Sequence, residues 1–241
     1  MEKNENETNI GEIIHTALSE NCLFETEKWA LERVEKIMRN FRESCELKKD
    51  YKVIIPWLNE FTAFTALGDY IFFARKLFQE CSSEAMAAFV IAHEIAHHKL
   101  GHMDMFPDKF KDNLSADISI FVAGAYRLVE SRLYGPEQEC DADRLGIEMC
   151  VSAGYDPYEC IKIFDKLEKI ALDKNDLGAV FGPDESDDEL LPDASKMTKL
   201  KIWLYQRKRG YLPIRDRRQM VLHHLDQLGV SRGSTADITA A

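Results

Sequence analysis

The sequence lacks any apolar run long enough to cross a membrane. A spanning helix needs about 20 consecutive, mostly apolar residues, whereas an uninterrupted run such as Ala85–Ala92 is far shorter and suits a buried helix of the core. The first residues, Met1–Glu7, have neither the basic nor the apolar region of a signal peptide. We therefore expect a cytoplasmic protein without a membrane span.

Positive charge is also scarce. The chain has 31 Lys and Arg residues against 42 Asp and Glu residues, which gives a formal net charge of −11. Nucleic acids and anionic lipid surfaces are bound by basic patches. We therefore expect neither nucleic acid nor a membrane surface as a partner, and we interpret the excess of acidic residues as an aid to solubility.

Paired cysteine motifs are missing. The six cysteines form no C-x-x-C pair, and a chain of 241 residues can bury a core without disulfides. We interpret the cysteines as reduced thiols. A zinc site made of cysteines is the less favoured alternative, because no two of them have the spacing of a zinc knuckle.

The content of 45% hydrophobic and 30% charged residues is that of a folded globular protein. We expect residues 1–25 to form an N-terminal segment that is partly disordered, with a short helix near Ile13–Leu18. With Thr26 as its N-cap, a helix is then predicted to run to about Lys48. Its core-facing residues recur at helical spacing: Trp29, Val34, Ile37, Met38 and Phe41.

Three extended segments follow this helix. Residues 51–58 read as a strand that contains Pro56, and residues 61–66 and 70–74 read as two further strands on either side of a glycine turn. We predict a small antiparallel sheet. The sequence leaves open whether the third strand lies at an edge, where it could bind an extended peptide.

Residues 83–99 carry polar side chains that a buried helix rarely has. The segment contains no Gly or Pro, begins with Ser83 as a possible N-cap, and is mostly apolar on all sides. Within it, His93, Glu94 and His97 form the pattern H-E-x-x-H. Residues four apart lie on one helix face, so both imidazoles can bind one metal ion with Glu94 beside its open side. This pattern is typical of zinc peptidases, in which the glutamate is the general base.

A catalytic zinc site needs three protein ligands and one open position. The third histidine of a metzincin would stand at position 103, which is a methionine here. Glu139 and Asp143 lie four apart on a helix predicted to start near Glu137. Glu139 can be the third ligand, and Asp143 can accept a hydrogen bond from the second ring nitrogen of His93. The alternative is that both carboxylates are exposed and pair with basic residues.

The remaining segments are expected to serve the fold. Further helices are predicted over residues 115–130, 158–172, 195–208 and 216–228, with an acidic flexible loop over 173–194 and a disordered tail over 231–241. The acidic loop lacks the spacing and the central glycine of a calcium-binding EF-hand. The other histidines are interpreted as structural or exposed residues: His98, His102, His223 and His224.

The H-E-x-x-H motif and the motifs that follow it in the chain resemble those of the gluzincin metallopeptidases of the peptidase family forty-eight type. This family includes the CAAX prenyl protease and the heat-shock protease HtpX. H-E-x-x-H is followed by Ser131-Arg132, by the segment Glu139–Asp143 in place of E-x-E-A-D, and by Gly154–Pro157, which reads G-Y-D-P. Ala63-Phe64 before the motif is similar to the family's N-A-F strand. The resemblance covers about residues 50 to 230.

The sequence departs from the family pattern at four places. Two extra residues separate Ser131-Arg132 from Glu139. Asp141 replaces the second glutamate of E-x-E-A-D, Thr62 replaces the asparagine of N-A-F, and Leu212 stands where the family has a histidine before Pro213. The family's membrane-embedded members have spanning helices that this chain lacks. The chain therefore resembles the stand-alone catalytic domains.

The resemblance implies an α+β fold, a mostly helical zincin-like domain over residues 26–230 with the small antiparallel sheet before the H-E-x-x-H helix. It implies a zinc-dependent endopeptidase acting on peptide or protein substrates, with one Zn²⁺ per chain on His93, His97 and Glu139. Glu94 would be the general base. The alternatives are a zinc-binding interaction module and a latent peptidase that needs a partner or loop release. The oligomeric state is not indicated.

The resemblance also implies a residue that stabilises the oxyanion of the reaction. Arg218, five residues after Pro213, is the candidate, with Arg215, Arg217 and Tyr211 as neighbours that could take its place. The alternative is that Arg218 is a surface residue of a basic helix.

Overall fold

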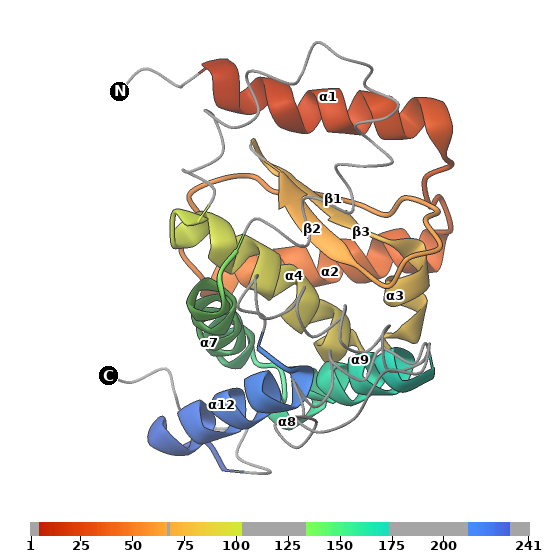
Figure 1. Cartoon of the computed structure of the whole chain (residues 1–241). Helices are drawn as coiled ribbons and strands as arrows, with labels where there is room; N and C mark the ends of the chain where they lie inside the picture. Colours follow the sequence, from red (N-terminus) through yellow and green to blue (C-terminus); the bar gives the residue numbers. More distant parts are fainter. Residues whose placement is uncertain (1–4, 67, 103–133, 174–211, 232–241) are drawn as a thin grey trace, which may run out of the picture.

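The computed structural model describes residues 5–66, 68–102, 134–173 and 212–231. These residues confirm the predicted α+β class, because they are mostly helical and contain one small sheet (Figure 1). In chain order the elements are α1 (Glu5–Asn21), α2 (Lys28–Ser44), β1 (Lys52–Ile54), β2 (Ala63–Ala66), β3 (Tyr70–Phe73), α3 (Arg75–Glu80), α4 (Glu84–Lys99), α7 (Pro136–Ser152), α8 (Pro157–Cys160), α9 (Lys162–Asp173) and α12 (Ile214–Gln227).

Several predicted segments lie wholly or almost wholly outside the described residues. They are the helices over 115–130 and 195–208, the acidic loop over 173–194 and the tail over 231–241. Within the described residues, no helix has both the length and the apolar character that a membrane crossing requires.

The sheet is mixed rather than antiparallel. Its strand order is β1-β3-β2, with β2 antiparallel and β1 parallel to β3. The chain turns back after β2, so β3 runs in the direction of β1 and lies between the other two strands. The third predicted strand is therefore central among the described strands. The first predicted strand ends at Ile54 rather than at residue 58, because Pro56 lacks the N–H that a strand residue donates. Pro56 forms an isolated bridge with Phe24 instead.

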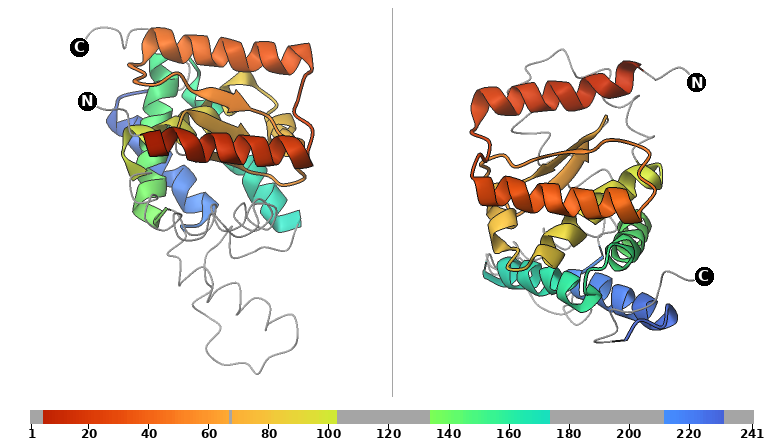
Figure 2. Two further views of the ribbon diagram at one scale, coloured as in Figure 1. Left: turned by 90° about the horizontal axis from the view of Figure 1, so that it is seen from above. Right: turned by 180° about the vertical axis from the view of Figure 1, so that it is seen from behind.

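Helices cover both faces of this sheet. Successive side chains of β3 alternate between the faces: Tyr70 and Phe72 pack with Leu18 of α1, whereas Ile71 and Phe73 belong to the larger core that α2, α4 and α7 share. Figures 1 and 2 show α1 over one face and α2 and α4 on the other. All four β3 side chains are buried, as expected for a strand covered on both sides.

The N-terminal region is more helical than predicted. Helix α1 extends from Glu5, and α2 begins at Lys28 with Glu27, not Thr26, as its N-cap. The buried carboxylate of Glu25 holds the segment that leads into α2, because it accepts hydrogen bonds from the N–H groups of Thr26 (3.0 Å) and Glu27 (3.1 Å). The predicted core stripe of α2 is buried except for Trp29, which is 49% exposed.

Helices α4 and α7 pack unusually closely, and this contact positions the site. A Cβ atom on Gly146 of α7 would lie 3.1 Å from the backbone nitrogen of His93 and 3.3 Å from its Cα atom. Glycine at this position therefore lets the two helix backbones approach each other beside His93. Because Glu139, Asp143 and Gly146 recur at helical spacing, the same face of α7 directs both carboxylates toward α4.

Candidate metal centre

Helix α4 presents both histidines of H-E-x-x-H on one face. Its N-cap is Ser83, whose side chain accepts a hydrogen bond from the N–H of Met86 (3.3 Å). Most of the helix is buried, and its polar residues therefore need partners inside the protein. The Nε2 atoms of His93 and His97 lie 3.1 Å apart. Two imidazole nitrogens thus converge on one point.

Glu139 of α7 completes a cluster of three potential ligands. Its Oε2 atom lies 3.6 Å from His93 Nε2, and its Oε1 atom lies 3.7 Å from His97 Nε2. The three donor groups lie within 4.8 Å of one another. Ligands about 2.0–2.1 Å from a tetrahedral zinc ion are separated by about 3.4 Å, so the observed spacings fit this ion. The His97 side chain is 1% exposed, whereas those of His93 and Glu139 are 13% and 18% exposed, so the cluster is accessible from their side.

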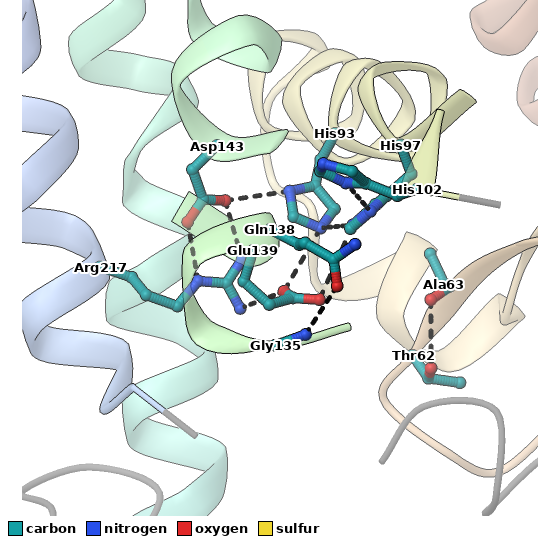
Figure 3. Close-up of polar contacts among 10 residues, drawn as sticks. All are labelled: Thr62, Ala63, His93, His97, His102, Gly135, Gln138, Glu139, Asp143 and Arg217. Carbon is teal, nitrogen blue, oxygen red and sulfur yellow. Dashed lines mark hydrogen bonds and ion pairs between the residues drawn. The ribbon is translucent and has the colours of Figure 1, made fainter. Parts of the chain in front are cut away.

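Asp143 contacts the other nitrogen of His93. Its Oδ1 atom lies 3.0 Å from His93 Nδ1, which leaves Nε2 directed at Glu139 and His97 (Figure 3). Arg217 of α12 binds the same carboxylate through Nε (2.7 Å to Oδ2) and Nη2 (2.7 Å to Oδ1). Burial alone would raise the pKa of Asp143, but Arg217 and His93 lower it by a larger amount, so that the pKa is about 2. Asp143 is therefore ionised and can orient His93.

Arg217 reaches the cluster, whereas Arg218 does not. The Nη1 atom of Arg217 lies 3.0 Å from Glu139 Oε2, so this guanidinium joins Glu139 to Asp143. Arg218 lies about 100° further around α12, and its Nε atom pairs with Asp165 of α9 at 3.1 Å. The sequence-based choice of Arg218 over Arg217 depended on a count from Pro213, which cannot tell which face of α12 meets α7.

His102 holds His97 in the same way that Asp143 holds His93. The Nδ1 atoms of His97 and His102 lie 2.9 Å apart, so one ring donates a hydrogen bond to the other. The sequence analysis assigned His102 no role at the site. The available signal was Gly101 after the helix: at φ 70° it reverses the chain and returns His102 beneath His97.

Tyr134 is a further aromatic residue at the cluster that the sequence analysis missed. Its ring stacks on the imidazole of His97 with centroids 3.7 Å apart and an interplanar angle of 19°. It directly precedes Gly135-Pro136, at which α7 begins. Nothing in the local pattern distinguished this tyrosine from a loop residue, because its neighbour His97 is 37 positions away.

The other histidines lie away from the cluster. His98 contacts the hydroxyl of Thr65 and the ring of Tyr51, and burial, aided by Lys49, lowers its pKa to about 3. His224 binds Glu148 at 2.7 Å and thereby links α12 to α7. His223 contacts Gln227 at the surface.

The pKa values of the two cluster histidines move in opposite directions. Burial lowers the pKa of His93, but the carboxylates of Asp143 and Glu139 more than offset this, and its pKa is raised. Burial lowers the pKa of His97 well below its ordinary value, and the neighbouring His93 and His102 lower it further. A neutral His97 has a free lone pair on one ring nitrogen, as a metal ligand requires.

Comparison with known proteins gives one match and one negative result. Residues 25–107 match the sequence profile of peptidase family M48. The matched segment covers α2 to α4, so it contains His93, Glu94 and His97 and ends before Glu139. No curated protein matches the chain. The profile match supports peptidase family M48 for the part of the chain that carries the H-E-x-x-H helix.

Proposed function

We propose that this protein is a zinc-dependent endopeptidase of the zincin-like, M48 type. The observation that carries the proposal is the convergence of His93, His97 and Glu139 from two helices that are far apart in the sequence. The match to peptidase family M48 over the H-E-x-x-H helix supports the same function independently of Glu139.

His93, His97 and Glu139 would hold the metal through Nε2, Nε2 and a carboxylate oxygen. These donors are those that zinc prefers in catalytic sites with one open position. Bound there, zinc would supply a Lewis acid that lowers the pKa of a water molecule toward ~7 and polarises a peptide carbonyl. The remaining chemistry belongs to side chains of this protein.

Glu94 is the general base of the proposed reaction. It lies between the two histidines in the sequence of α4 and is 6% exposed, so its carboxylate acts in a shielded site. It accepts the proton of the attacking water and then delivers this proton to the nitrogen of the leaving amine. Proton transfer by one residue in both steps leaves Glu94 in its starting state.

Asp143 and His102 position the two histidine ligands. Each contacts the Nδ1 atom of its histidine, at 3.0 Å for Asp143 and 2.9 Å for His102. These contacts fix the ring orientation and leave the Nε2 lone pairs for the metal. Arg217 in turn fixes Asp143 with two hydrogen bonds.

The substrate is a peptide or protein segment in extended form. Strand β2 lies at an edge of the described sheet and packs beside α4. An extended peptide can add to the edge of a sheet by backbone hydrogen bonds. A substrate bound along Ala63–Ala66 would thus pass close to the metal helix without needing a particular side chain for its attachment.

Hydrolysis of a quenched fluorescent peptide library tests the proposal. Zinc-loaded wild type should cleave internal peptide bonds, and Glu94→Gln should lower kcat by about 10²–10⁴-fold while it retains zinc. Glu60→Gln, an exposed carboxylate change, should leave kcat unchanged. If wild type binds zinc and cleaves no peptide, the site belongs to a zinc-binding module or a latent enzyme, and the proposal is wrong in its present form.

A further inference from the structure

A chain of two hydrogen bonds joins helix α4 to strand β2. His98, the residue after the potential ligand His97, contacts the hydroxyl of Thr65 through its Nε2 atom. The same hydroxyl donates a hydrogen bond to the backbone carbonyl of Tyr70 (3.2 Å). Because a hydroxyl has only one hydrogen to donate, the Thr65 oxygen must accept from an N–H at Nε2 of His98. The imidazole of His98 is therefore a hydrogen-bond donor from α4 to β2.

Neighbouring residues fix both partners of this contact. The buried ring of Tyr51 lies against the ring of His98, with centroids 5.2 Å apart. Thr65 is 2% exposed and lies opposite Ile71 of β3 in the antiparallel register. Opposite residues of paired strands point to the same face of the sheet, and Ile71 belongs to the core that α4 shares. The side chain of Thr65 therefore points toward α4.

His98 lies on the same face of α4 as Glu94. The two residues are four apart in the sequence, so Glu94 lies one helical turn before His98. This face is about 100° around the helix axis from the face that carries His93 and His97. Helix α4 thus directs one face toward Glu139 and an adjacent face, which carries the proposed general base, toward β2.

Strand β2 is the proposed binding place of the substrate. It lies at an edge of the described sheet and packs beside α4. Figure 3 shows Ala63 of this strand on the opposite side of the cluster from Arg217. A peptide added to this edge takes its position from the backbone of β2, whereas Glu94 and the two histidines take theirs from α4. The distance between strand and helix therefore decides whether the peptide carbonyl reaches the reacting groups, and a misplacement of about 1 Å can lower a rate ~10²-fold.

We propose that His98 is a positioning residue that fixes the substrate-binding strand β2 against the helix of the metal centre, an assignment that rests on the proposed peptidase function. Without the N–H of His98, the Thr65 hydroxyl keeps its bond to Tyr70 within the sheet but loses its bond to α4. Strand β2 can then shift relative to α4, while the donor groups of His93 and His97 keep their places on the helix. The role concerns extended ligands that reach β2, and not small ligands that bind the metal alone.

The variant His98→Leu tests this role with two ligands of the zinc-loaded protein. The first is an extended phosphinic peptide, whose anionic phosphinate binds the metal and whose flanking residues would lie along β2. The second is acetohydroxamate, which binds the metal and is too small to reach the strand. We expect the Kd of the phosphinic peptide to rise about tenfold, the usual contribution of one hydrogen bond. Zinc content and the Kd of acetohydroxamate should stay unchanged.

Three further variants make the test specific for the hydrogen bond. His98→Gln keeps an N–H donor at a similar distance from the backbone and should restore most of the peptide affinity. Thr65→Val removes the acceptor and should weaken peptide binding as His98→Leu does. The double variant should be no weaker than either single variant, because both remove the same interaction. His223→Leu is the matched control, because His223 is an exposed histidine that contacts Gln227 on α12.

The outcomes separate this inference from the proposed function. An unchanged Kd of the phosphinic peptide in both His98→Leu and Thr65→Val would overturn the positioning role and leave the peptidase standing. Loss of zinc, or equal weakening of both ligands, in these two variants would assign the contact to the fold of the metal helix and would also overturn the inference. A wild type that binds no zinc would overturn the proposed function and the inference together.

Discussion

Each imidazole of the candidate centre has one nitrogen for the metal and one for a partner. His93 is oriented by a carboxylate and His97 by a second histidine. The carboxylate is the stronger acceptor because it carries a full charge, and Arg217 holds it in place through two hydrogen bonds. The affinity of the site for zinc therefore depends on side chains that do not touch the metal.

Asp143→Asn should weaken zinc binding by about 10–100-fold. Asparagine keeps the shape of the side chain but not the charge that orients His93 and pairs with Arg217. The measurement is the zinc Kd from competition with a fluorescent chelator. Glu137→Gln is the control, because Glu137 is an exposed carboxylate on the same helix. Equal zinc affinity in both variants would contradict a positioning role for Asp143.

At the level of residues, the sequence indicated which groups could act but not all of the groups that meet. H-E-x-x-H and the pair Glu139 and Asp143 were recognisable because each lies within one helix, where spacing determines the face. Tyr134 and His102 were not, because each contacts His97 through a loop whose path depends on tertiary contacts. Arg217 was named only as a neighbour of Arg218, since the packing of α12 on α7 decides between them.

At the level of elements, the site depends on how closely α7 approaches α4. Gly146 lies two turns after Glu139, and its missing side chain allows the α7 backbone to contact the backbone of His93. The spacing between the two ligands from α4 and the one from α7 is thus set by a residue outside the cluster.

Gly146→Ala should lower both stability and zinc affinity. The new Cβ would lie 3.1 Å from the nitrogen of His93, so the helices must move apart by a few tenths of an ångström. We expect a loss of about 1–3 kcal/mol in the free energy of unfolding and about a tenfold weaker zinc Kd, measured by urea denaturation and chelator competition. Ser152→Ala, an exposed change on the same helix, is the control. Because alanine favours helix by ~1 kcal/mol over glycine, a more stable variant with normal zinc affinity would refute the close-packing argument.

Glu25→Gln should destabilise the start of α2 in a pH-dependent manner. Burial raises the pKa of Glu25, but Arg75, whose Nε lies 2.6 Å away, and the N–H groups of Thr26 and Glu27 lower it below the ordinary value of 4.5. A lowered folded-state pKa adds stability that is complete above pH 4.5 and is lost as pH falls through the folded-state pKa.

The expected stability difference between wild type and Glu25→Gln is about 1–3 kcal/mol at pH 7. It should shrink when urea denaturation is repeated at pH 4 and pH 3. Glu27→Gln, an exposed neighbour, should show little difference at any pH. A difference for Glu25→Gln that stays constant from pH 7 to pH 3 would contradict the assignment of a charged, paired carboxylate.

Elements were easier to predict from the sequence than their pairing. Helix α4 and the three strands were recognisable from apolar runs and turn residues. The parallel pairing of β1 with β3 was not, because local patterns carry no information on which strand lies between the others. The exposed position of Trp29 was missed for a similar reason. Helical spacing predicts which side of a helix faces the core, but the neighbouring element decides how wide the buried part of that side is.

For the whole molecule, the metal would add a link between α4 and α7 to their packing and to the contact of His93 with Asp143. Helix α4 follows the sheet in the sequence, and α7 leads to α8, α9 and α12. A ligand that binds only the folded state stabilises it by mass action. Zinc should therefore raise the melting temperature of the whole domain.

Removal of zinc with a chelator should lower the melting temperature, and added zinc should restore it. At free zinc ~1,000-fold above Kd the gain is about 4 kcal/mol, which corresponds to about 8–16 °C for a chain of this size. Glu94→Gln should keep this zinc-dependent shift, whereas His97→Ala should lose it. Calorimetry with and without the chelator is the measurement, and an equal shift in His97→Ala would show that zinc acts at another site.

The central claim is that His93, His97 and Glu139 form one zinc site, and the most direct test is the zinc content of protein purified without added metal. We predict about one zinc per chain in wild type and far less in Glu139→Ala. Glu137→Ala, an exposed change two residues earlier on α7, should retain the wild-type content. No zinc in wild type after reconstitution, or full zinc content in Glu139→Ala, would contradict the account.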